Sequence, residues 1–220
     1  MLKKSLLCGL YLLSLVGCEN RVDQSQELRH DDGRAKPKVA ILNIIDHSNS
    51  CLPWDLSQEL TTEITDKLKN QASIFIVSQD ELTWEKEPDF EKIHPFKNDN
   101  FIKTYRPNAE FIVCIEMINH LLLPSKQKQN MAHPNAQTQN LVIKARVKVF
   151  DVRKDEPKLI LSEIVTESQI VPWQLSTIDY KKNHFKTNQY KITPIGLSHK
   201  RLIHTITNHI QDYVLLAKSV

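Results

Sequence analysis

A strict alternation of apolar and polar side chains in residues 141–149 constrains the fold more than any other feature of the sequence. Leu141, Ile143, Ala145, Val147 and Val149 fall on one face of an extended chain, and Lys144, Arg146 and Lys148 fall on the other. A period of two is typical of a strand with one buried face. Residues 159–170 form a second apolar run after a short polar turn, which predicts an antiparallel hairpin.

The register of this hairpin follows from its charges. Placing Arg146 opposite Glu163 gives the basic face an acidic side chain and keeps the other face apolar. We therefore expect Val147 to lie near Ser162. The three cations then form, most simply, a solvated or helix-covered face of a sheet.

The remaining elements are apolar runs of strand or helix length. Strand-sized runs rich in Val, Ile and Phe are residues 39–45, 74–77 and 111–118. Apolar residues at four-residue spacing predict two amphipathic helices, 55–68 and about 198–218. Asp55 and Gln58 resemble a capping box at the start of the first.

The order strand, helix, strand, helix, strand, strand, strand, helix predicts a mixed α/β fold with a single five-stranded sheet on which the helices pack. The second helix, within residues 88–105, has the least regular pattern. Because βαβ units make the first three strands parallel, the loops after the first, third and fifth strands should share one edge of the sheet. These loops are residues 46–55, 119–140 and 171–197.

Residues 1–17 have the pattern of a secretory signal peptide. Its apolar core of about 11 residues is shorter than the roughly 20 that cross a bilayer. The segment Leu15-Val16-Gly17-Cys18 resembles the lipobox of bacterial lipoproteins. That resemblance implies cleavage before Cys18, a diacylglycerol on its thiol and an acyl group such as palmitate on the new amino group. An ordinary signal peptide with a chance cysteine is the alternative.

A lipid on Cys18 would determine where the protein resides, because two acyl chains hold a protein stably on a bilayer. In the lipoprotein family, Glu19 in place of Asp favours the outer membrane of the bacterial envelope, at its periplasmic face, over the inner membrane. Residues 18–37 are polar and predict a flexible tether. Residues 38–220 then form a single α/β domain.

Composition argues against several classes of function. After residues 1–17 the chain holds 27 basic and 26 acidic side chains, so it has no general attraction to nucleic acid. It has four glycines, and Gly9 and Gly17 belong to the signal peptide. Phosphate-binding loops and nucleophile elbows need glycine. We therefore expect no enzyme and no cofactor apart from the lipid on Cys18.

Cysteine and histidine positions leave two questions for the structure. Cys51 and Cys114 could form a disulfide outside the cytoplasm, or remain two separate buried thiols. The loop histidines 47, 120, 133 and 184 lack the short spacings of zinc sites, so we expect no metal site. Histidines 199, 204 and 209 are spread around the last helix, which predicts surface or rim positions.

The long loops contain two candidate contact sites. Trp54 and Trp173 each follow a proline directly after a strand, and they form either an exposed docking patch or the packing beneath their own loops. Residues 180–191 repeat an aromatic side chain followed by lysine, which suits a glycan or another anionic polymer. A solvated loop pinned by aromatics is the alternative. The candidate residues of this segment are Tyr180, Lys181, Lys182, Phe185, Lys186, Tyr190 and Lys191.

In element order and hydrophobic pattern, residues 38–218 resemble the α/β domain of periplasmic lipoproteins of the CsgG and LpoB type and the N-terminal domain of TolB. The segments Val39-Ala40-Ile41-Leu42 and Ala109-Glu110-Phe111-Ile112-Val113 carry the resemblance. It implies an envelope interaction domain, although residues 124–140 lack the alternation of a pore-lining hairpin. We therefore expect a non-enzymatic interaction or assembly module that binds an envelope protein. Binding of peptidoglycan or another glycan through residues 180–191 is the alternative.

Overall fold

The computed structural model describes residues 28–83, 96, 101–104, 107–124 and 138–219. The chain divides into two units, Met1–Lys36 and Pro37–Val220. In the first unit, Arg29 and Ala35 form an isolated antiparallel bridge, and the Arg34 guanidinium lies 2.7 Å from the Asp32 carboxylate. The described end of the predicted tether therefore contains a local turn.

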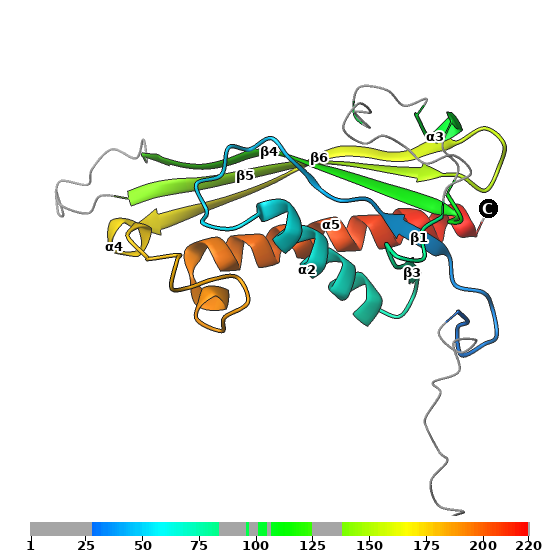
Figure 1. The fold of residues 1–220 in the computed structure, drawn as a ribbon, viewed down its shortest axis with the longest axis horizontal. Coiled ribbons are helices and arrows are strands. Elements are labelled where there is room, and N and C mark those ends of the chain that lie inside the picture. Colours follow the sequence, from blue (N-terminus) through cyan, green and yellow to red (C-terminus); the bar gives the residue numbers. More distant parts are fainter. Residues whose placement is uncertain (1–27, 84–95, 97–100, 105–106, 125–137, 220) are drawn as a thin grey trace, which may run out of the picture. The chain divides into compact units, whose positions relative to one another are not determined.

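The second unit is built on one mixed sheet (Figure 1). Its strands are β1 (Lys38–Ile41), β2 (Ile45–Asp46), β3 (Phe75–Val77), β4 (Phe111–Pro124), β5 (Thr138–Asp151) and β6 (Lys158–Pro172). The strand order is β3-β1-β4-β5-β6, and β2 pairs with β4. β1 is parallel to β3 and β4, whereas β4, β5 and β6 form an antiparallel meander. The predicted α/β class, with its parallel and antiparallel parts, is confirmed.

The described sheet has six strands rather than the predicted five, because the first predicted strand is interrupted. The backbone N–H of Ile44 donates to Oγ1 of Thr61 on the following helix, at 3.1 Å, instead of continuing the β-ladder. The chain then pairs again at β2, where Ile45 lies opposite Glu116. A buried apolar run thus contains a side-chain hydrogen bond that its sequence pattern did not reveal.

The hairpin register predicted from charge is wrong by one residue. Arg146 lies opposite Ile164 rather than Glu163. It finds its acidic partner on the other neighbouring strand, where the guanidinium lies 2.8 Å from Glu116. Glu163 instead faces His209, at 2.6 Å. The prediction considered one hairpin, whereas β5 is a central strand with two neighbours.

β4 and β5 are longer than predicted. β4 continues to Pro124 and β5 begins at Thr138, so part of the loop predicted for residues 119–140 is strand. The pairing of the two strands shifts between Met117 and Asn119. Such a bulge interrupts the two-residue period, which is why the sequence pattern ended there.

Two helices cover one face of the sheet, α2 (Leu56–Asn70) and α5 (Pro194–Lys218) (Figure 1). Asp55 caps α2 by accepting a hydrogen bond from the Ser57 backbone N–H at 2.9 Å. α5 begins earlier than the predicted residue 198, because Thr193 caps it. The predicted apolar stripes are all buried: Leu56, Leu60, Ile64 and Leu68 on α2, and Leu202, Ile206, Ile210 and Val214 on α5.

The other face of the sheet has a smaller core of its own. The short helix α3 (Phe101–Thr104) places Phe101 and Ile102 against Ile112 and Phe150. Between β6 and α5 the chain forms two further short helices, α4 (Trp173–Ser176) and η1 (Tyr190–Ile192). This connection and the loop before α2 supply most of the site described next.

Candidate functional site

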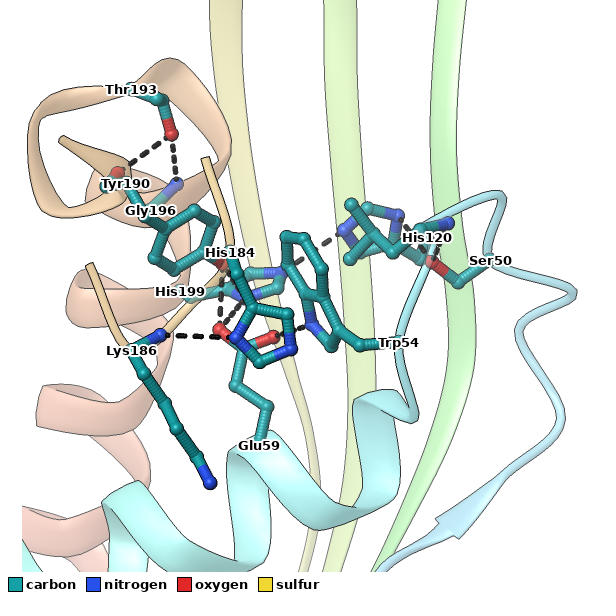
Figure 2. A network of polar contacts seen from close by, with 11 residues as sticks. Ser50, Trp54, Glu59, His120, His184, Lys186, Tyr190, Thr193, Gly196 and His199 are labelled. Carbon is teal, nitrogen blue, oxygen red and sulfur yellow. Dashed lines mark hydrogen bonds and ion pairs between the residues drawn. The ribbon is translucent and has the colours of Figure 1, made fainter. Parts of the chain in front are cut away.

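A buried carboxylate joins α2 to α5 and to the loops that precede both helices (Figure 2). Glu59 lies on the inward stripe of α2 and is 1% exposed. Its Oε2 accepts a hydrogen bond from Nε1 of Trp54 at 2.7 Å. Its Oε1 accepts one from the Tyr190 hydroxyl at 2.6 Å and lies 2.8 Å from Nδ1 of His199. Both carboxylate oxygens are therefore satisfied by side chains.

Two further residues extend this arrangement towards β4. Nε2 of His199 lies 3.0 Å from Nε2 of His120, and Nδ1 of His120 lies 3.4 Å from Oγ of Ser50. When His199 donates from Nδ1 to Glu59, one of the two facing Nε2 atoms must carry a proton and the other must accept it. We call Ser50, Trp54, Glu59, His120, Tyr190 and His199 the Glu59 network.

The electrostatics of the Glu59 network favour an ionised Glu59 and an uncharged His120. Burial alone would raise the pKa of Glu59, but His199, Tyr190 and Trp54 offset it and hold that pKa below its ordinary value. Burial, reinforced by the neighbouring His199, lowers the pKa of His120 to about 4. At neutral pH the network therefore contains a carboxylate and a neutral His120.

Aromatic rings surround the outer side of Glu59. The Trp54 ring centroid lies 4.9 Å from His184, 5.9 Å from Phe185, 5.4 Å from Tyr190 and 6.3 Å from Tyr180. Trp54 belongs to the 46–55 loop and the other rings to the 171–197 segment. These two loops therefore meet at one edge of the sheet, as the topology predicted.

The start of α5 is fitted closely to this cluster. Thr193 Oγ1 donates to the Tyr190 carbonyl at 2.8 Å and accepts from the Gly196 N–H at 3.1 Å. A Cβ atom on Gly196 would lie 2.1 Å from the Tyr190 carbonyl oxygen. Gly196 is thus required by a close approach of two backbone segments, which fixes Tyr190 over Glu59.

Residues 180–191 present lysines outward and aromatic rings inward. Lys181, Lys182, Lys186 and Lys191 are exposed, whereas Phe185 and Tyr190 are buried and Tyr180 is partly buried. Nζ of Lys186 lies 5.5 Å from the centroid of the Phe185 ring. The segment therefore exposes charge to solvent, and its rings mainly hold the loop in place.

Trp173 is placed differently from Trp54. It lies on α4 and is 47% exposed, and α4 follows directly on the end of β6 (Figure 1). Five other apolar side chains at this end of the sheet are 39% to 51% exposed. We call the residues of this end the hairpin-end patch: Leu121, Leu122, Leu123, Ile170, Trp173 and Leu175. Because side chains alternate along a strand, Leu122 faces the opposite side of the sheet from Leu121 and Leu123.

The remaining candidates give no clustered site. Both cysteines are free thiols, so the disulfide is not formed; Cys114 is buried as expected, but Cys51 is exposed, so the prediction of two buried thiols is wrong for Cys51. Within the described ranges, no three His, Cys, Asp or Glu side chains come together in a way that could hold a metal ion. Cys18 and His133 lie outside the described residues. His47 contacts Glu116 at 2.9 Å.

Neither the role of Glu59 nor the burial of His199 was predicted from the sequence. His199 was expected at the surface, but it is 1% exposed. Its spacing of three and four residues from Leu202 and Ile203 places it on the buried stripe of α5. Glu59 likewise lies beside Leu60 on the buried stripe of α2. Polar residues at inward helix positions were the signal that could have identified both.

Most of the chain matches a protein family in sequence and solved proteins in structure. Residues 25–218 match a family of unknown function, DUF7499. No curated protein sequence matches the chain. The 1.65 Å structure of the hypothetical protein CT253 from Chlamydia trachomatis has a TM-score of 0.61 and 24% identity, covering 82% of this chain and 98% of that one. This similarity supports the fold.

Weaker structural matches include two proteins named as lipoproteins. GNA1162 from Neisseria meningitidis has a TM-score of 0.37 and 10% identity, covering 80% of this chain and 99% of that one. A minor lipoprotein from Acinetobacter baumannii has a TM-score of 0.38 and 10% identity, covering 81% and 92%. The resemblance to CsgG, LpoB and TolB stays a prediction. None of the helices in the described part of the chain has the length and hydropathy needed to span a bilayer.

Proposed function

The chain belongs to the DUF7499 family, and we propose that it is a non-enzymatic, lipid-anchored module of the bacterial cell envelope that binds a protein partner through its hairpin-end patch. The sequence supports the anchor: a cationic start, a short apolar core and the segment Leu15-Val16-Gly17-Cys18. Two acyl chains at Cys18 would suffice to hold the protein on a membrane. Glu19 favours the outer membrane.

The hairpin-end patch carries the second half of the proposal because it lacks charge. The three described segments that form this end are residues 121–124, 138–143 and 168–176, and they contain no Asp, Glu, Lys or Arg. A quarter of the whole chain is charged. The central part of a protein interface is depleted in charged residues and enriched in aromatic ones. The patch therefore suits a partner with an uncharged, apolar surface.

The strand pairing holds the patch in a defined shape. Leu123 on β4 lies opposite Asn140 on β5, which lies opposite Ile170 on β6. Two of the apolar side chains are thus positioned by continuous backbone hydrogen bonding across three strands. A surface ordered before binding loses less conformational entropy when the partner docks.

The Glu59 network supports the proposal of a docking surface that is ordered before binding. Its contacts join side chains from α2, α5, β4 and two loops. A buried polar network of this kind positions the chain segments that meet in it. We therefore assign it the role of holding the loops at the patch end of the domain.

Site-specific photo-cross-linking in bacterial cells tests the partner. A cross-linker at Leu123 or Trp173 should capture one protein. A matched cross-linker at Ile164, which is 56% exposed on β6 but lies opposite Arg146, should not. Adducts with lipid alone, or equal capture at all three positions, would contradict the proposed docking surface.

The anchor has its own test. The intact mass of protein extracted from membranes should correspond to a chain that begins at Cys18 and carries acyl groups. Cys18→Ser should abolish both cleavage and acylation. An unmodified chain that is washed off membranes in aqueous buffer would rule out the anchor.

A second candidate function is binding of peptidoglycan or another anionic glycan. The observation that favours it is the outward display of Lys181, Lys182, Lys186 and Lys191. Purified cell-wall sacculi should then retain the protein, and changing all four lysines to Gln should release it. Retention that is insensitive to these changes would argue against this loop.

A further inference from the structure

A pocket of about 320 Å³ opens between α2 and α5, and Glu59, Tyr190 and His199 of the Glu59 network line it. Phe185, Tyr190 and Ile203 contribute its apolar wall. His199 and Glu59 also border it, but their polar atoms already have partners within the Glu59 network. Small-molecule sites are typically clefts of about 300 Å³ or more with a largely apolar lining, so this one suits a small ligand.

The rim of the pocket is positively charged. Lys67 from α2, Lys191 from η1 and Lys200 from α5 line it, against one acidic side chain at the rim, Glu63. In the part of the chain that the structure describes, none of the four forms an ion pair within 4.0 Å. Three cations from three different elements therefore line one opening, which they share with the single acidic side chain of Glu63.

Glu63 is the one acidic side chain at the rim, against three lysines. Burial, with the nearby negative charge of Glu59, raises the pKa of Glu63 above its ordinary value. The carboxylate of Glu59 is itself compensated by three hydrogen-bond donors. The pocket mouth is thus an electropositive site next to an apolar wall.

We infer that this pocket binds a small organic acid with a ring-sized apolar face, of which an acidic sugar is the type that fits best. Its carboxylate would meet Lys191 and Lys200 at the rim. The C–H face of its ring would pack on Phe185 and Ile203, as sugar rings commonly pack on apolar side chains. A neutral sugar of the same size would lack the contact with the lysines, and charged hydrogen bonds are the stronger ones.

Glucuronate and glucose form a matched pair of probes, because they share the ring and differ in one carboxylate. Titrations use the full chain purified from membranes in detergent, with binding followed by calorimetry and by Trp54 fluorescence. Trp54 is a suitable reporter because its ring contacts Phe185 and Tyr190. We expect binding of glucuronate and none of glucose at the same concentrations. Equal binding of both sugars, or binding of neither, would overturn the inference.

Single substitutions distinguish binding in the pocket from binding by exposed lysines that do not line it. Lys191→Gln and Lys200→Gln should each weaken glucuronate binding about tenfold, the loss expected for one charged hydrogen bond. Lys181→Gln, an exposed lysine that does not line the pocket, should change it less than twofold. Glu63→Gln should strengthen binding, because it removes the one opposing charge at the rim. Equal losses from all three lysine variants would show non-specific charge attraction instead.

This inference is independent of the protein-partner proposal. None of the hairpin-end patch residues lines the pocket. Trp173→Ala should therefore leave glucuronate binding unchanged, and Lys191→Gln should leave photo-cross-linking through Leu123 unchanged. If either substitution abolishes the other function, the two sites are not separate.

Discussion

Nδ1 of His199 lies 2.8 Å from Oε1 of Glu59, although 140 residues separate them in the chain. Both residues are 1% exposed. An unpaired charge in such a place would cost several kcal/mol, so each residue makes burial of the other tolerable. The pair therefore fixes α2 against α5 at the end of the sheet where the loops meet.

Replacing the acid should destabilise the protein strongly. Glu59→Gln keeps the shape of the side chain but removes the charge that faces His199. The amide N–H₂ of Gln would also face side chains that donate hydrogen bonds to Glu59 and would leave one of them without an acceptor. We expect the free energy of unfolding to fall by about 2–4 kcal/mol, measured by urea denaturation with circular dichroism. Glu63→Gln, one turn later on the same helix, is the control, with a change of about 0.5 kcal/mol or less. Equal effects would mean that the network contributes little.

Stability should depend on the protonation of His120. Its pKa is about 6.5 in an unfolded chain and about 4 in the folded protein, so the unfolded state binds more protons between these values. The free energy of unfolding should be highest above pH 6.5 and should fall, by on the order of 3 kcal/mol, as the pH drops towards 4. His120→Gln should flatten this part of the profile. The profile would contradict the prediction if wild type and variant ran parallel.

Gly196 should not tolerate a methyl group. Gly196→Ala places a Cβ 2.1 Å from the Tyr190 carbonyl oxygen, so the backbone around Tyr190 must move. We expect a loss of about 1–3 kcal/mol together with a red shift of Trp54 fluorescence. Leu197→Ala, the next residue and 38% exposed, is the control and should change neither measurement appreciably.

The two thiols should differ in reactivity. Cys51 is exposed and Cys114 is buried, so a maleimide should modify Cys51 in the native protein and Cys114 only after denaturation. Peptide mass mapping locates the label. Recovery of a peptide that links the two residues by a disulfide would contradict the structure.

Local pattern was enough to predict most of the fold. The alternation in residues 141–149 and the four-residue stripes of α2 and α5 each have a single repeat length, and burial follows that repeat directly. Errors appeared where a neighbour outside the pattern decided the outcome. Arg146 pairs with Glu116 on β4 instead of with Glu163, and only the tertiary position of β5 could show this.

The candidate site was harder to predict, because its residues are distant in the sequence. The meeting of the 46–55 and 171–197 loops followed from strand direction alone. The identity of the residues that join them did not, since His199 was expected at the surface and no pattern singled out Glu59. Both residues occupy positions on the apolar stripe of their helix, and that position is the sequence signal of their burial.

The length of β4 also sets how far the hairpin-end patch lies from the start of the domain. Val39 in β1 pairs with Phe111, at the first residue of β4, and Leu123 lies 12 residues further along the same strand. At about 3.3 Å per residue, the strand separates these positions by roughly 40 Å. A molecule that docks on Leu123 therefore binds at a distance from the start of the domain that is comparable to the thickness of a whole bilayer.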